Sequence, residues 1–255
     1  MTNEKVDLEK LDNPVKRLHR ILEKARPQPG NVAIRYVWAD ALGVERTDVV
    51  ELYLALAELV RLFHTAKGSV ERLKDVNRDY YLEPFDNIEV VITNSNLEQP
   101  WNTLKDRLDE VTMLTLQMAS NIVSVEEGKT AISEKPLQEL QAETEGLLEK
   151  VLDTDFSSKE LKAVLIEHLE SIRRAILAYR VSGTEGLRRA VESAFGALVL
   201  HREQVKNAVE QDEKKKGIFR GYVSLLANIC QIASLGITIA QLTGILPPLL
   251  GPGGS

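Results

Sequence analysis

Residues 221–246 contain no charged side chain, and this run limits the folds open to the chain more than any other feature. It reads GYVSLLANICQIASLGITIAQLTGIL, holds no His or Pro, and is followed directly by Pro247 and Pro248. About 20 such residues in a helix are enough to cross the hydrocarbon core of a bilayer. The sequence therefore predicts a transmembrane helix over 221–246 and a short tail over 247–255. The competing interpretation is a buried helix of a soluble bundle.

Polar residues recur within the run at steps of three or four, which places them on one side of a helix. These residues are Ser224, Asn228, Gln231, Ser234, Thr238 and Gln241. Polar groups in hydrocarbon cost free energy unless they are paired, so this stripe favours a pore lining or an oligomer contact over a simple anchor. Gly236, Ala240 and Gly244 add the small-xxx-small spacing at which membrane helices pack closely, which favours a homo-oligomer.

Basic residues precede the run and none follows it. They are Lys214, Lys215, Lys216 and Arg220. Basic residues are retained on the cytoplasmic side of a membrane helix and attract anionic lipid headgroups. These patterns predict a single-pass membrane protein, with its N-terminal body in the cytoplasm and membrane lipid as a partner.

The formal net charge is −6. This total includes the basic cluster before the run, so the net charge of the rest of the chain is more negative still. An acidic body argues against nucleic acid as a partner, because phosphate binding needs a basic surface. The lone cysteine, Cys230, excludes an intrachain disulfide and a cysteine-based zinc site. No apolar segment occupies the N-terminus, so we expect no secretory signal.

Helical patterning dominates the remainder, and we expect an all-α fold with a multi-helix bundle over residues 1–200. Asn13 followed by Pro14 predicts a helix start, Gly43 a helix end and Gly183 a break. The helix from Thr47 to Ala66 is apolar around most of its circumference, and we expect it to be the most buried. Another helix begins near residue 102 and has one apolar face, formed by Leu104, Leu108, Val111, Leu114, Met118, Ile122 and Val125.

Two segments of the body depart from this pattern. Residues 77–101 contain Pro84, Pro100 and a β-branched run, and we expect an irregular connector there. Residues 201–220 are polar but compatible with a helix, which predicts a long stalk ending in the basic flank.

The sequence offers no sign of an enzyme or a cofactor site. It contains no P-loop, dinucleotide-binding, zinc-protease or nucleophile-elbow motif. Glu167, His168 and Glu170 lie close together, but a metal site would need ligands from facing helices, so a solvated helix face is the better interpretation. We therefore expect no catalytic residue, no cofactor and no metal.

The segment over 167–198, EHLESIRRAILAYRVSGTEGLRRAVESAFGAL, resembles a helix pair found in uncharacterised bacterial all-helical proteins. The resemblance covers about an eighth of the chain and implies a bacterial source, so the membrane of the predicted single-pass protein would be the bacterial inner membrane. It implies no function.

Three functional hypotheses follow. In the first, copies assemble through the C-terminal helix and form a pore or disrupt the membrane, as a toxin or an anti-phage protein would. In the second, a tail-anchored adaptor binds a protein partner or trigger through its helical body. In the third, a soluble helical interaction protein buries the C-terminal segment. The terminal GPGGS has the composition of a linker and enters none of them.

Overall fold

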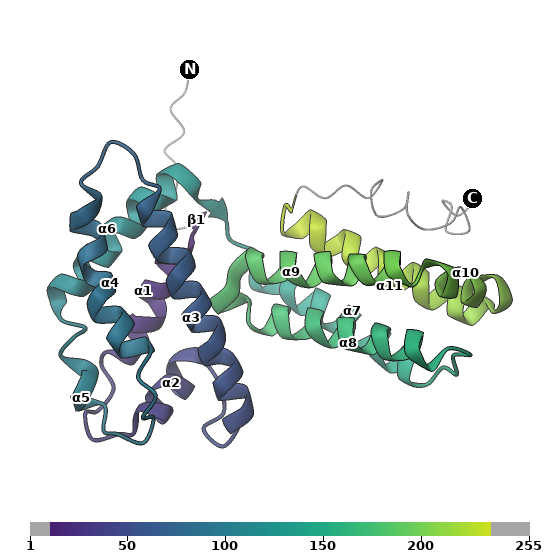
Figure 1. The fold of residues 1–255 in the computed structure, drawn as a ribbon, viewed down its shortest axis with the longest axis horizontal. Helices are drawn as coiled ribbons and strands as arrows, with labels where there is room; N and C mark the ends of the chain where they lie inside the picture. Colours follow the sequence, from purple (N-terminus) through teal and green to yellow (C-terminus); the bar gives the residue numbers. More distant parts are fainter. Residues whose placement is uncertain (1–10, 236–255) are drawn as a thin grey trace. The chain divides into compact units, whose positions relative to one another are not determined.

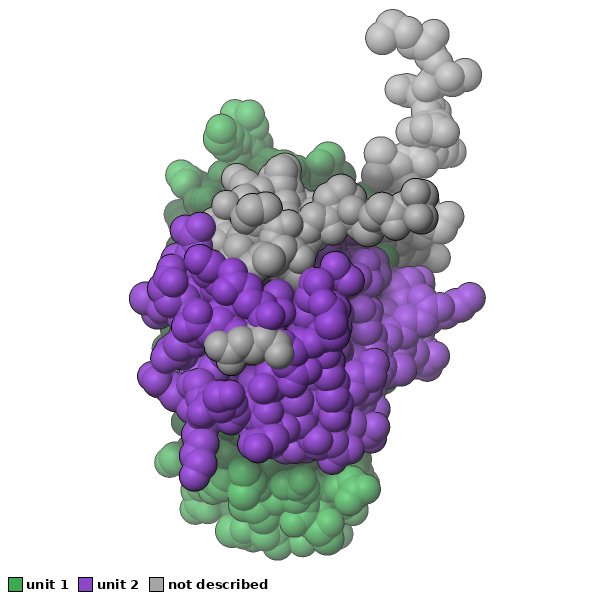
Figure 2. All heavy atoms as spheres, turned by 90° about the vertical axis from the view of Figure 1, so that its right-hand side faces the viewer, with its two compact units in different colours: residues 1–131, 180–183 green, residues 132–179, 184–255 purple. Residues whose placement is uncertain are grey.

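The computed structural model of the protein describes residues 11–235, and these residues form two compact helical units (Figures 1 and 2). Unit 1 comprises residues 11–131 and 180–183, and unit 2 comprises residues 132–179 and 184–235. Strand structure in this part of the chain is limited to β1 (Leu11–Asp12), which pairs antiparallel with β2 (Lys129–Thr130). The predicted all-α fold is confirmed. The single bundle expected over 1–200 is instead divided between the two units.

Unit 1 is a bundle of four long helices with two short ones beside it. Its helices are α1 (Pro14–Ala25), α2 (Ile34–Leu42), α3 (Val49–Glu71), α4 (Arg78–Ile92), α5 (Asn102–Lys105) and α6 (Glu110–Glu127). Helix α1 packs against α3 and α6, and α4 also packs against α3 and α6, so the four helices enclose one core. Trp38 and Trp101 meet edge to face within that core, with ring centroids 6.0 Å apart.

Local signals in the sequence set several helix ends in unit 1. Asn13 caps α1 by accepting a hydrogen bond from the Lys16 N–H at 2.9 Å. Gly43 ends α2 in the left-handed region, with φ +76°, as expected for a residue without a Cβ. Both predicted boundaries are confirmed.

The prediction of an irregular connector over 77–101 is wrong, because most of this segment forms the helix α4. Pro84 lies inside α4 and is buried. The β-branched run is helical as well, because Ile88, Val91 and Ile92 fill the core of unit 1 from one side of the helix. Burial of these side chains outweighs their weak preference for strands.

Unit 2 contains the remaining described helices except for residues 180–183 of α9, which belong to unit 1. These helices are α7 (Glu134–Leu152), α8 (Lys159–Leu177), α9 (Tyr179–Leu200), α10 (Arg202–Gln211) and α11 (Glu213–Ile232). Helix α7 packs against α8 and α11, and α10 packs against α11 (Figure 1). The predicted stalk over 201–220 is wrong. Val205 and Val209 of α10 and Ile218 and Phe219 of α11 are buried in the core of unit 2, so this polar segment carries enough apolar residues to fold back.

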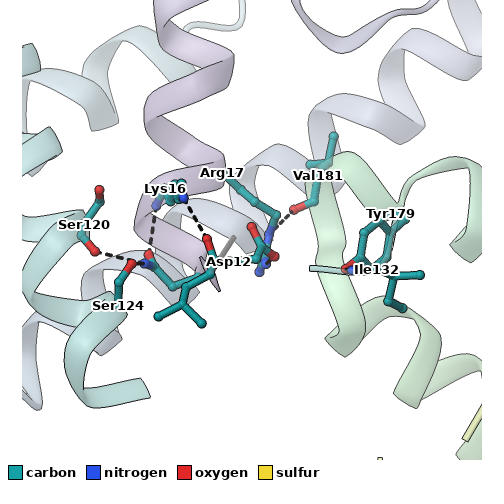
Figure 3. Close-up of polar contacts among 10 residues, drawn as sticks. Asp12, Lys16, Arg17, Ser120, Ser124, Ile132, Tyr179 and Val181 are labelled. Carbon is teal, nitrogen blue, oxygen red and sulfur yellow. Dashed lines mark hydrogen bonds and ion pairs between the residues drawn. The ribbon is translucent and has the colours of Figure 1, made fainter. Parts of the chain in front are cut away.

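Helix α9 is interrupted at Gly183, as the sequence predicts, and Arg17 contacts the residues at this interruption, which belong to unit 1 as Arg17 does (Figure 3). Arg17 is buried, pairs with Asp12, and donates from Nε to the Val181 carbonyl oxygen at 3.1 Å. Gly183 has φ +60°, and a Cβ there would lie 2.4 Å from the guanidinium carbon of Arg17. Only glycine fits this position without displacing Arg17.

Candidate interaction surfaces

Helix α11 contains the first half of the charge-free run, and its apolar side forms part of the core of unit 2. The buried residues of α11 are Ile218, Phe219, Tyr222, Val223, Leu225, Leu226, Ile229 and Cys230. Burial raises the pKa of the Tyr222 phenol and of the Cys230 thiol above their ordinary values. This half of the run therefore contributes a helix to the core of unit 2.

The described part of the polar stripe lies on the opposite side of α11 from these residues. Ser224, Gln231 and Ser234 are exposed to solvent. Asn228 is half-buried and donates from Nδ2 to Glu143 Oε2 of α7 at 3.1 Å. Solvent and one side-chain partner thus account for these four polar residues. Thr238 and Gln241 lie outside the described residues, as do Gly236, Ala240 and Gly244.

Helix α11 ends at Ile232, so the expected continuous helix over 221–246 is not what the structure shows. Ser234 has φ +49°, its N–H donates to the Gln231 carbonyl oxygen at 3.2 Å, and the Leu235 N–H donates to the Cys230 carbonyl oxygen at 3.0 Å. These two bonds form a Schellman cap, which satisfies the last carbonyl groups of a helix. Within residues 11–235, no helix combines the length and the apolar character that crossing a membrane requires.

The predicted headgroup-binding cluster begins α11, and two of its four members have acidic neighbours. Lys215 lies 3.4 Å from Asp212, and Lys216 lies 2.7 Å from Glu213. The ammonium of Lys215 also lies 5.9 Å from the centre of the Phe156 ring. Lys214 and Arg220 are exposed. These ion pairs offset part of the positive charge that would attract an anionic surface.

Helix α6 of unit 1 exposes a row of apolar side chains to solvent. The exposed fractions are 69% for Val111, 54% for Leu114, 41% for Met118 and 73% for Val125, and Ile122 is half-buried. We call these five residues the α6 stripe. They belong to the apolar face predicted for one helix beginning near residue 102, but the structure divides this segment into α5 and α6. Leu104 of α5 and Leu108 before α6 are buried, whereas the part of the predicted face on α6 points outward.

The buried side of α6 is rich in hydroxyl groups. It comprises Thr112, Met113, Thr115, Leu116, Ala119, Ser120, Val123 and Ser124. Asn13 helps to hold this side toward the core. Its Nδ2 donates to the Ser120 carbonyl oxygen at 2.9 Å and to Ser124 Oγ at 2.7 Å (Figure 3). Asn13 itself is only 2% exposed. These buried bonds leave the α6 stripe on the outside.

A second apolar surface lies on the first two turns of α3. Val49, Val50, Tyr53 and Leu54 are all exposed, by 43% to 72%. Only the later part of the helix, from Leu59 to Val70, is continuously built into the core. The expectation that this helix is the most buried of the body is therefore wrong for its first half.

A groove of about 520 Å³ lies beside the N-terminal end of the α6 stripe and shares Leu114 with it. Its charged and titratable lining residues are His19, Glu23, Arg26, Lys105 and Glu110. Burial lowers the pKa of His19, and the nearby Glu23 carboxylate opposes that shift. The groove thus combines cationic and anionic groups next to an apolar helix face.

No group of three or more His, Cys, Asp or Glu side chains capable of holding a metal ion occurs among the described residues. Glu167, His168 and Glu170 lie on α8, where Glu170 pairs with Arg173 at 2.8 Å. Burial lowers the pKa of His168. No protein-family model matches the chain, and neither a curated protein nor a solved structure matches it. The surfaces described above therefore have to be interpreted from their own geometry.

Proposed function

We propose that the protein is a helical interaction protein that keeps the first half of its charge-free run folded inside unit 2. The observation that supports this proposal is the burial of eight α11 side chains in the core of that unit. The exposed apolar surfaces on α3 and α6 offer contacts for protein partners, since patches of this kind on a monomer are often functional.

The run cannot lie in the core of unit 2 and in a bilayer at the same time, because both states use the same apolar side chains. A fully buried apolar side chain contributes about 1.5–3 kcal/mol, so removing α11 from unit 2 costs on the order of 10 kcal/mol or more. That cost is comparable with the whole stability of a domain, about 5–15 kcal/mol. A helix over 221–246 inserted in a bilayer thus requires unit 2 to lose its core first.

A membrane effector is the second candidate, and the composition of the run favours it. Residues 236–246 continue the charge-free run beyond α11, and every basic residue near the run precedes it. In this candidate a trigger releases α11, the run inserts, and copies assemble through the polar stripe to form a pore. The cytoplasmic orientation follows from the same basic residues.

A disulfide between α7 and α11 would separate the two candidates. A Cβ on Gly221 would lie 2.8 Å from Leu147 Cδ2, so the two positions face each other between α11 and α7 and are the place to engineer a bridge. The variant Leu147→Cys/Gly221→Cys/Cys230→Ser holds α11 in unit 2 when oxidised and frees it when reduced. The measurement is flotation with anionic vesicles, together with leakage of an entrapped dye.

We expect wild-type protein to stay in the lipid-free fraction and both redox forms of the variant to behave like it. The Cys230→Ser protein is the matched control, because it has no cysteine to bridge. The opposite result is that the wild type and the reduced variant float with vesicles and release the dye, that oxidation of the variant abolishes both effects, and that a thiol restores them. This result would favour the membrane effector over the interaction protein.

A further inference from the structure

The spacing of the α6 stripe is symmetric, so a second copy of the same helix can match it. The five residues of the stripe are separated by three, four, four and three positions, so the pattern is the same in both chain directions about Met118. When two such helices lie antiparallel with their Met118 residues opposed, Leu114 of one faces Ile122 of the other. Val111 likewise faces Val125. We propose that the α6 stripe is a two-fold interface between two copies of this chain.

The remainder of the helix surface is compatible with this pairing. Between Val111 and Val125 the exposed or half-buried side chains are apolar or uncharged, with Gln117 and Asn121 as the polar members. No charge is therefore buried between the copies, which would be costly. Methionine at the centre is flexible and polarizable, and it adapts to a partner surface with little strain.

The ends of the helix favour an antiparallel arrangement over a parallel one. Antiparallel pairing places the positive N-terminal end of each α6 beside the negative C-terminal end of the other. It also brings Glu126 of one copy toward Glu110 of the other, where Arg26 and Lys105 line the adjacent groove. These two cations offset the repulsion between the carboxylates.

The size of the stripe predicts a weak dimer. Its four exposed members present roughly 400 Å² of apolar surface, whereas a stable interface covers about 800 Å² on each partner. Association should therefore depend on concentration in the micromolar range. The interface lies wholly on unit 1 and does not depend on whether the run near the C-terminus is sheltered or inserted.

Sedimentation of the full-length chain tests the interface directly. We expect the wild type to convert from monomer to dimer as its concentration rises, and Met118→Lys to raise the dissociation constant about tenfold or more, since two like charges would meet on the axis. Leu200→Lys is the matched control, because Leu200 is 84% exposed on α9 and lies outside the stripe. A wild type that stays monomeric at every concentration, or equal effects of the two substitutions, would overturn the proposal.

Cysteine substitution tests the symmetry itself. Met118→Cys places two thiols at the two-fold axis, so mild oxidation should give a covalent dimer. Val111→Cys should not, because its thiol faces Val125 of the other copy. The combination Val111→Cys/Val125→Cys should cross-link again. The wild type controls for the native Cys230, which is buried. Cross-linking of Val111→Cys as efficient as that of Met118→Cys would refute the antiparallel register.

Discussion

Helices α6 and α11 are similar in length, yet α11 exposes polar side chains whereas α6 exposes a stripe of apolar ones. In α11 the apolar side is buried and Ser224, Gln231 and Ser234 are exposed. In α6 the serines and threonines are buried together with Met113, Leu116 and Val123, and the apolar stripe is exposed. The comparison shows that a helix can carry apolar residues on two sides, and that periodicity alone does not determine which of these sides turns inward. That choice depends on what the neighbouring helices offer.

The largest expected difference between the two helices follows from placing a carboxylate on each apolar face. Leu226→Asp buries an unpaired charge in the core of unit 2, where Leu226 is fully buried, and should lower the free energy of unfolding by several kcal/mol. Leu114→Asp places the same group on an exposed position of α6 and should change the stability of unit 1 by less than about 1 kcal/mol.

The two tryptophans make this comparison measurable unit by unit. Trp38 and Trp101 both lie in unit 1, so their fluorescence reports on unit 1 alone, whereas far-ultraviolet circular dichroism reports on both units. In urea titrations, Leu226→Asp should remove part of the dichroism transition and leave the fluorescence transition in place. Similar losses from the two substitutions would show that α6 is as buried as α11.

The second effect concerns the buried bonds that hold α6 in its orientation. Asn13→Ala removes the cap of α1 and leaves the Ser120 carbonyl and the Ser124 hydroxyl without this partner. The cap contributes about 1 kcal/mol and an unsatisfied buried group costs about 1–3 kcal/mol, so unit 1 should lose roughly 2–4 kcal/mol. Tryptophan fluorescence in urea measures the loss.

Asp48→Ala is the control for Asn13→Ala. Asp48 caps α3 through the Glu51 N–H at 2.9 Å and lies at the surface, so its removal should cost only about 1 kcal/mol. Equal losses from the two alanine variants would mean that Asn13 acts only as a cap and does not fix α6.

The sequence predicts helix ends well where a single residue determines them. Each of these helix ends has a local cause. Asn13, before Pro14, supplies a side-chain acceptor, and Gly43 and Gly183 adopt a backbone conformation that favours glycine. The fold class follows from the same helical periodicity. These features are local, and the chain shows them without reference to any partner.

The failures arise where distant residues decide. The helix α4 was not predicted because Pro84 and the β-branched residues after it suggest a break, and only packing against α3 and α6 makes the helix favourable. The orientation of α6 depends on Asn13, which lies 107 positions before Ser120 in the sequence. The pore role of the polar stripe stays a prediction, because sequence alone does not distinguish side chains facing water from side chains facing a lumen.

A smaller effect tests the C-terminal cap of α11. Ser234 adopts a left-handed conformation that glycine tolerates better, so Ser234→Gly should stabilise unit 2 by up to about 1 kcal/mol. Ser224→Gly is the matched control, because Ser224 lies inside the helix and the same change there should destabilise by about 0.5–1 kcal/mol. Circular dichroism in urea measures both. Destabilisation by Ser234→Gly would indicate that α11 continues through residue 234.

The smallest expected effect compares one histidine in each unit. Burial lowers the pKa of His19 in α1 and of His168 in α8 below the ordinary value of 6.5. The unfolded chain therefore takes up protons more readily than the folded chain as the pH falls. The stability contributed by each neutral imidazole is present above pH 6.5 and is lost as the pH falls from there through the lower, folded-state pKa. The carboxyl groups of Asp40 and Asp109, whose pKa values are lowered by hydrogen bonds, titrate at more acidic pH and leave this window to the histidines.

His19→Gln should flatten the pH dependence of the fluorescence transition, because that signal belongs to unit 1. His168→Gln should flatten only the part of the dichroism transition that belongs to unit 2. A stability that rises between pH 7 and pH 5 in the wild type would mean that both imidazoles gain a stabilising partner on protonation, which would contradict the burial described here.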